Sequence, residues 1–165
     1  MPLTPSQATP EECVEYSEGS CHYLALALHQ KLGWEMSVQI DQAEHFWEDE
    51  ADGDNYLPAV LHVYAIDPNG QAWDIHGRRP QDEIREDIEA RFSPMEPDSD
   101  DCRSEGELRC YVGEWADAGE DPIERPLHTY TQEDLDRAWQ VAVRVFDGMA
   151  GFIPAVPVSA PRPGR

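Results

Sequence analysis

Residues 18–29 read EGSCHYLALALH, and residues 61–77 read LHVYAIDPNGQAWDIHG. The first stretch has the apolar spacing of a helix, and it places a cysteine at the helix start. The second has two runs rich in β-branched and aromatic residues around Pro-Asn-Gly, which is the pattern of a β-hairpin. We therefore predict an α+β fold in which an N-terminal helix carries the cysteine and packs on a small antiparallel sheet.

The predicted helix begins next to Cys21. Its apolar face is marked by leucines four residues apart, at Leu24, Leu28 and Leu32. We expect Ser20 to cap the first turn and Gly33 to end the helix in the left-handed conformation. In the first turn, unpaired backbone N–H groups and the helix dipole favour the thiolate of Cys21, which is the nucleophilic form.

The register of the hairpin decides which polar side chains share a face. If residues 68–70 form a three-residue loop with Gly70 left-handed, Tyr64 lies opposite Asp74. His62 and Asp74 then project from one face as diagonal neighbours, roughly 5–8 Å apart at their side-chain bases. A two-residue Asn-Gly turn would instead place them on opposite faces.

The order of cysteine, histidine and aspartate over residues 15–77 resembles the papain-like and transglutaminase-like cysteine enzyme superfamily. In that superfamily a helix carries the nucleophile against an antiparallel sheet. The resemblance implies a catalytic triad in which Cys21 is the nucleophile, His62 the general base and Asp74 the group that orients the base. Its members include thiol proteases, amidases, acyltransferases, transglutaminases, effector toxins and inactive relatives, so the resemblance implies a mechanism and leaves the substrate open.

Other interpretations of the same residues stay open. His76 is a rival base on the face of His62, whereas the side chain of His22 leaves the helix about 100° away from Cys21. The side chains of Cys21, His62, Asp74 and His76 are also zinc ligands by type. No close ligand pair lies on one element, so we predict no metal and no cofactor. A structural role is the simplest interpretation of each residue alone, since free cysteines are usually buried and inert.

The charge of the chain is strongly negative. It has 34 acidic and 12 basic residues among 165, for a net charge of −22. This charge opposes binding to nucleic acids and anionic membranes, because both are polyanions. It favours a basic peptide or protein as substrate or partner. A solvated surface, adaptation to high salt and mimicry of nucleic acid are alternative explanations of the same excess.

The length and the hydrophobic content of 40% are typical of one domain with a real core. We assign this domain to residues 1–150, with acidic insertions at 42–57 and 93–121, and a Pro-rich tail at 151–165. The first insertion is expected to be a long connection after a strand at 34–41. A further edge strand is expected at 108–115.

A short helix is expected to begin with the capping residues Thr9–Glu12, and two longer helices are expected after the hairpin. One opens at Pro80, and its core side is marked by Ile84, Ile88 and either Phe92 or Arg91. The other is amphipathic and is capped by residues 131–134. Its apolar stripe comprises Leu135, Ala138, Trp139, Ala142, Val143 and Phe146.

The four cysteines lack the paired close spacing of a zinc site. Cys102 and Cys110 could pair if the protein were exported. However, no charged and apolar leader pattern opens the sequence, and no run approaches the roughly 20 apolar residues of a membrane helix. We therefore expect a cytoplasmic protein. An acidic run at 49–55 lacks the ligand spacing of an EF-hand calcium loop.

The sequence thus predicts a cysteine-dependent hydrolase or acyltransferase that acts through a thioester on a peptide or amide. The alternative is a non-catalytic acidic protein, an inhibitor or nucleic-acid mimic, that docks on a basic partner. An inactive relative kept as a scaffold is the third hypothesis.

Overall fold

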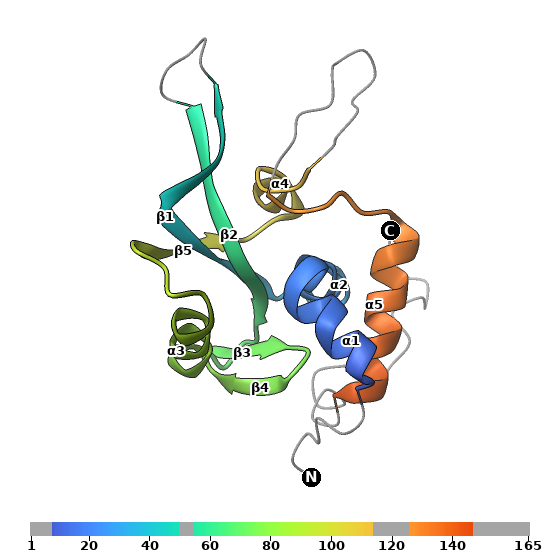
Figure 1. Ribbon diagram of the computed structural model, residues 1–165. Coiled ribbons are helices and arrows are strands. Elements are labelled where there is room, and N and C mark those ends of the chain that lie inside the picture. Colours follow the sequence, from blue (N-terminus) through green and yellow to red (C-terminus); the bar gives the residue numbers. More distant parts are fainter. Residues whose placement is uncertain (1–7, 50–54, 114–125, 147–165) are drawn as a thin grey trace, which may run out of the picture.

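The computed structural model describes residues 8–49, 55–113 and 126–146. Five strands form one antiparallel sheet in the order β4-β3-β2-β1-β5 (Figure 1). The strands are β1 (Glu35–Asp49), β2 (Asn55–Ile66), β3 (Gln71–Asp74), β4 (Gly77–Pro80) and β5 (Pro97–Cys102). The helices are α1 (Pro10–Val14), the π-helical turn η2 (Glu15–Gly19), α2 (Cys21–Leu32), α3 (Gln81–Phe92), α4 (Glu105–Arg109) and α5 (Gln132–Val145).

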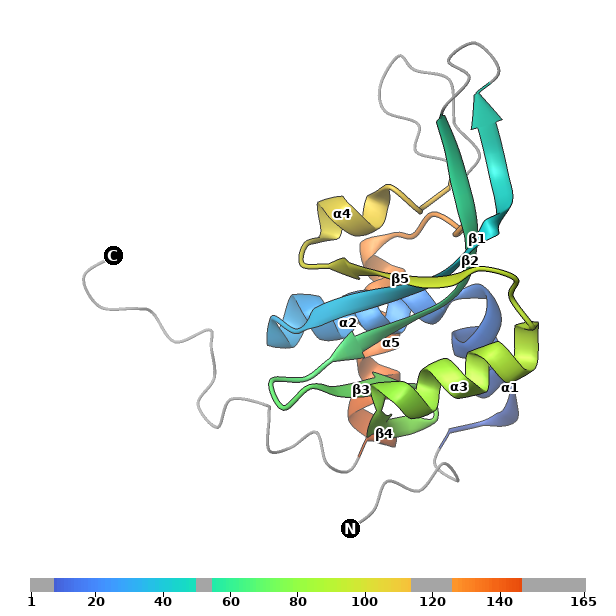
Figure 2. The ribbon, with the colours of Figure 1, turned by 90° about the vertical axis from the view of Figure 1, so that its left-hand side faces the viewer.

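The sheet has helices on both faces (Figures 1 and 2). Helix α3 packs on one face, where Ile84 and Ile88 contact Tyr64 and Ala72. Helix α2 packs on the other face, and α5 covers the far side of α2. The larger core cluster extends along the chain from Tyr16 to Phe146 and contains most of α2. The predicted α+β architecture, with a cysteine-bearing N-terminal helix and a C-terminal helix, is confirmed.

Helix α2 starts and ends where the sequence predicts, but its first turn is capped differently. Gly33 adopts the left-handed conformation with φ 74°, as expected for a C-terminal glycine. Ser20 is the N-cap residue, yet its side chain makes no capping hydrogen bond. The preceding π-helical turn explains this, because the Ser20 N–H donates to the carbonyl of Glu15 and holds Ser20 outside the extended backbone of a side-chain cap.

The hairpin has the register that places His62 and Asp74 on one face. Ile66 pairs with Ala72, the Asp67 N–H donates to the carbonyl of Gln71, and Gly70 is left-handed with φ 81°. The three-residue loop is therefore confirmed over the two-residue turn. The chain then turns back at Ile75 and His76 and adds strand β4, which the sequence did not predict.

In its described part, the first acidic insertion is not a loop. Strand β1 continues to Asp49 and pairs with β2 as far as Asn55, so most of residues 42–57 belong to a long two-stranded arm that extends beyond the rest of the sheet (Figure 2). Irregular pairing after Asp41 and at His45 bends this ladder. Composition predicted a connection here, but pairing with β2 outweighs the low strand propensity of acidic residues. The acidic run at 49–55 mostly lies outside the described residues.

The edge strand lies earlier than predicted. Residues 97–102 form β5 beside β1, whereas residues 105–109 form helix α4. The side chain of Ser104 accepts from the Glu107 N–H, and a Glu107 carboxylate oxygen accepts from the Arg103 N–H. These two hydrogen bonds cap a helix, which explains why the predicted strand at 108–115 does not form in its described part.

Helices α3 and α5 begin close to where the sequence predicts. Some of the residues predicted for their buried faces are exposed. Helix α5 has the expected capping box at Thr131 and Asp134. Val143, however, is 47% exposed, while Val145 is buried in its place. In α3, Phe92 is 41% exposed because the chain leaves the helix directly after it, through the left-handed Ser93. The Pro-rich tail at 151–165 lies outside the described residues.

Among the described residues, no helix combines the length and the apolar character that crossing a membrane requires.

Gly70→Ala should lower the free energy of unfolding by about 1 kcal/mol, because an alanine at φ 81° is strained. Apart from the adjoining residues of the chain, no described atom lies within 4 Å of the new methyl group, so the backbone conformation accounts for the cost. Urea unfolding measures it. Gly106→Ala is the matched control, since its methyl group meets only Ser104 Oγ, at 3.8 Å, within helix α4. The control should be neutral or stabilising, and equal losses in both variants would contradict this account of the turn.

Candidate active site

Cys21 is the first residue of helix α2, as predicted. Its side chain is buried, with 3% of the residue exposed, and it belongs to the main core cluster. At this position the backbone N–H of Cys21 has no carbonyl four residues earlier within the same helix. The positive end of the helix dipole therefore acts on the sulfur.

His62 and Asp74 meet in the structure. Nε2 of His62 lies 3.0 Å from a carboxylate oxygen of Asp74, and both residues are 3% exposed. The same carboxylate oxygen accepts from Nη2 of Arg79 at 3.1 Å, while the other oxygen accepts from the His76 N–H at 2.9 Å. Three donors therefore fix the carboxylate, and the carboxylate fixes the orientation of the imidazole.

The thiol of Cys21 and the imidazole of His62 interact. Burial by itself raises the pKa of Cys21, but the interactions with His22 and His62 outweigh burial and lower this pKa from 9.0 to about 6. Burial would lower the pKa of His62, but the hydrogen bond to Asp74 and the neighbouring Cys21 raise it to about 10. These opposite directions favour the pair of thiolate and imidazolium over the neutral pair.

Cys102 shows that burial alone does not activate a cysteine in this protein. It is 2% exposed, almost the same as Cys21. Burial and the neighbouring carboxylates of Glu107 and Asp100 raise the pKa of Cys102 to about 12. Two equally buried thiols thus shift in opposite directions, because one faces imidazoles and the other faces carboxylates. All four cysteines are free.

His76, the rival base, has a different partner. Its Nε2 lies 3.0 Å from Oγ of Ser17, which belongs to the π-helical turn before Cys21. The imidazole is exposed, whereas Ser17 is 6% exposed. This contact ties the segment that precedes the nucleophile to the turn that follows Asp74. It therefore helps to hold the two halves of the site together.

His22 follows Cys21 in the first turn of α2. The residue is fully buried, and its Nε2 lies 2.7 Å from the backbone carbonyl of His128. The interaction of its imidazole with Cys21 contributes to the low pKa of the thiol. Its Nδ1 has no hydrogen-bond partner among the described residues, so His76 and His22 both remain less suited than His62 as the base for Cys21.

The contacts of Arg79 with Asp74 and of Ser17 with His76 were not predicted from the sequence. Arg79 reaches Asp74 because β4 pairs with β3, placing Arg79 opposite Ala72. The sequence does contain one indication of this strand. Asp74 is followed three residues later by Gly77, and this spacing is typical of a tight turn, which would lead into a new strand. No local pattern indicates the contact of Ser17, which joins residues 59 positions apart.

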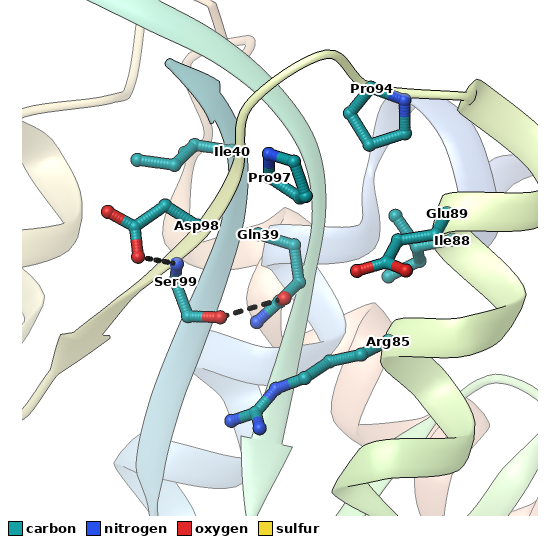
Figure 3. Close-up of a pocket in the computed structure, with 9 residues that line it drawn as sticks. All are labelled: Gln39, Ile40, Arg85, Ile88, Glu89, Pro94, Pro97, Asp98 and Ser99. Atoms are coloured by element: carbon teal, nitrogen blue, oxygen red, sulfur yellow. Dashed lines mark hydrogen bonds between the residues drawn. The ribbon is translucent and has the colours of Figure 1, made fainter.

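Two cavities lie near the site without being lined by its residues. One, of about 350 Å³, lies between α3, β1 and β5, where Arg85 reaches towards Gln39 and Ser99 (Figure 3). The side-chain amide of Gln39 forms hydrogen bonds with Ser37, Tyr64 and Ser99, so it does not indicate a ligand-binding site. The other, of about 450 Å³, lies between η2 and α5 and is lined by Tyr16 and Arg137.

Within the described part of the chain, no three or more histidine, cysteine, aspartate or glutamate residues are grouped so that they could hold a metal ion.

Comparison of the chain with protein-family models, with curated proteins and with solved structures found no significant match.

Asp74→Asn should remove a contribution to stability that depends on the ionised carboxyl group. Burial raises the pKa of Asp74, but His62 and Arg79 outweigh burial and lower it from 3.8 to about 2. The ionised form therefore favours folding, and its contribution is complete above pH 3.8 and is lost as the pH falls through about 2. Urea unfolding across this range should show the stability of the wild type converging on that of the variant.

Asp82→Asn is the matched control for the loss of one negative charge, because the side chain of Asp82 is 90% exposed. If both variants follow the same pH dependence, the buried contacts of Asp74 do not stabilise its ionised form.

Proposed function

We propose that the protein is a cysteine-dependent hydrolase or acyltransferase that acts on a peptide or amide through a thioester on Cys21. One observation carries the proposal. Nε2 of His62 is held by Asp74, while Nδ1 of His62 is buried and has no hydrogen-bond partner among the described residues. Nδ1 is therefore the nitrogen left to exchange a proton with the thiol of Cys21.

The reaction would proceed in two steps. The thiolate attacks the carbonyl carbon, and the electron pair of the C=O bond moves to oxygen. When the tetrahedral species collapses, the C–N bond breaks, and the leaving nitrogen takes the proton from Nδ1 of His62. Water or an amine then attacks the thioester and gives a proton to the same nitrogen. Cys21 leaves as the thiolate, and the acid or the new amide departs.

Two features would stabilise the charges that develop. The backbone N–H of Cys21 at the start of α2 would donate to the oxyanion, with the helix dipole in support. Asp74 would hold His62 in the tautomer that leaves Nδ1 free and would balance the imidazolium charge. Arg79 would keep Asp74 ionised and in place.

The order of the three residues and their setting support membership of the papain-like or transglutaminase-like superfamily as part of this proposal. A helix carries Cys21, and neighbouring antiparallel strands carry His62 and Asp74. A net charge of −22 favours a basic peptide or protein substrate. Because Cys21 and His62 are each 3% exposed, a substrate would reach the sulfur only after the groups around it separate.

A second candidate is a non-catalytic acidic protein that docks on a basic partner. It is favoured by the open edge of the sheet, where β5 carries Asp98 and Asp101 in exposed positions. Acidic residues on an edge strand also discourage aggregation, so they fit a structural role equally well. In this candidate Cys21→Ala would leave partner binding intact, and binding would weaken with salt.

The alkylation of Cys21 tests the proposed enzyme. In the variant Cys13→Ser/Cys110→Ser the two buried thiols, Cys21 and Cys102, remain. Iodoacetamide should label Cys21 with half-maximal rate near pH 6, while Cys102 stays unreactive through neutral pH, because its pKa is raised to about 12. Mass spectrometry of the digested protein reports both sites in one sample.

His62→Ala should abolish the reactivity of Cys21 at low pH, because burial without the imidazolium favours the neutral thiol. If Cys21 reacts as slowly as Cys102 at pH 7, or if His62→Ala leaves its profile unchanged, the enzyme proposal is wrong. For a reactive thiol, incubation with an activated acetyl ester should then add one acetyl group to Cys21.

A further inference from the structure

The cavity between α3, β1 and β5 contains two charged side chains that the proposed reaction does not use. Arg85 and Glu89 lie four residues apart on α3, and both extend from the helix towards the sheet (Figure 3). This spacing allows an ion pair along one helix face, but these two described side chains form none. Nη1 of Arg85 instead lies 3.5 Å from a carboxylate oxygen of Asp82. Opposite charges therefore line one cavity without neutralising each other directly.

The guanidinium of Arg85 is only weakly engaged by its neighbours. Its partner Asp82 has a side chain that is 90% exposed, and an ion pair in such a setting contributes little. Nη2 donates to Gln81 at the long distance of 3.4 Å. Nε is buried and has no hydrogen-bond partner among the described residues, which is unfavourable for a donor. A carboxylate bound in the cavity would give the guanidinium the bidentate partner that it lacks.

Glu89 is the acidic side chain of the cavity that has no partner. It is exposed, and it forms no side-chain hydrogen bond or ion pair within the part of the chain that the structure describes. Asp98, which also lines the cavity, is already engaged. It accepts from the Ser99 N–H at 2.8 Å and from the side-chain amide of Gln42 at 3.1 Å. A positively charged group in the cavity would therefore bind at Glu89.

The remaining wall of the cavity is largely apolar. It is formed by Ile40 and Ile88, which are 1% and 4% exposed, and by the rings of Pro94 and Pro97 (Figure 3). The volume of about 350 Å³ lies near the lower end of the range for small-molecule pockets, roughly 300–1,000 Å³. The cavity thus offers one cationic and one anionic group beside an apolar wall, at a size that suits a small molecule.

We propose that this cavity binds a free α-amino acid with an apolar side chain, such as leucine. The carboxylate of the ligand accepts from Arg85, its ammonium group donates to Glu89, and its side chain packs on the isoleucines and prolines. A ligand with one charge would leave one of the two groups unpaired. The net charge of −22 also opposes a free anion, whereas a zwitterion carries no net charge. The inference goes beyond the proposed function, since binding here requires no reaction at Cys21.

Three ligands test which charges are recognised. Leucine carries both charges, leucinamide lacks the carboxylate, and N-acetylleucine lacks the ammonium group. The full chain is titrated with each ligand, and binding is followed by calorimetry and by the backbone amide NMR signals. We expect leucine to bind saturably, with the largest shifts at residues 85–89 and 97–99. Each analogue should bind more weakly by about tenfold or more, because it loses one charge-assisted hydrogen bond.

Variants of the two charged residues test where leucine binds. Arg85→Gln and Glu89→Gln should each weaken the binding of leucine by about tenfold or more, for the same reason. Arg103→Gln and Glu86→Gln are the matched controls, since both residues are exposed and lie outside the lining of the cavity. The controls should bind leucine as the wild type does. Circular dichroism reports whether each variant folds.

Three results would each overturn the inference. Leucine gives no saturable binding to the wild type, either analogue binds as tightly as leucine, or the cavity variants bind leucine like their controls. The proposed function fails by a different result, which is a Cys21 thiol that stays unreactive at low pH or that keeps its reactivity in His62→Ala. The two can therefore fail independently.

Discussion

The buried contact between His62 and Asp74 is the interaction on which the site depends. Two ionisable groups that are each 3% exposed must neutralise one another, because an unpaired charge in the core is very costly. The carboxylate is satisfied further by Arg79 and by the His76 N–H. These contacts form only because β3 and β4 follow β2 closely in the sheet. The geometry of the hairpin therefore determines whether His62 can carry a charge.

The two buried cysteines show what the fold adds to a thiol. Cys21 and Cys102 have almost the same exposure, yet the pKa of Cys21 is lowered to about 6 and that of Cys102 is raised to about 12. The first lies at a helix start among imidazoles, and the second lies beside Glu107 and Asp100. Reactivity in this chain is therefore a property of the neighbours, which the residue type and its burial do not reveal.

Local chemistry was enough to predict helix α2 and the start of α5, and it limited the hairpin loop to two alternatives, of which the structure has the three-residue one. A glycine that requires φ 81° and a threonine that caps a helix act within a few residues, so their signals lie in the sequence. The predictions failed where contacts between residues far apart in the sequence determine the local structure. The arm of β1 exists because β2 pairs with it, and Arg79 joins the site because β4 pairs with β3. The contact between His62 and Asp74 was predicted because both residues lie in one hairpin, where the register sets the distance between them. The contacts of His22 and Ser17 join segments far apart in the sequence, and they were not predicted.

The most direct test of the account is the ionisation of His62 and Cys21 in the folded protein at neutral pH, since it does not depend on access to the buried sulfur. Nitrogen NMR of the His62 ring and carbon NMR of the Cys21 Cβ, followed as the pH is raised, report the two groups separately. The account predicts that Cys21 loses its proton near pH 6 while His62 keeps its charge up to about pH 10. A neutral His62 beside a protonated Cys21 at pH 7 would contradict it.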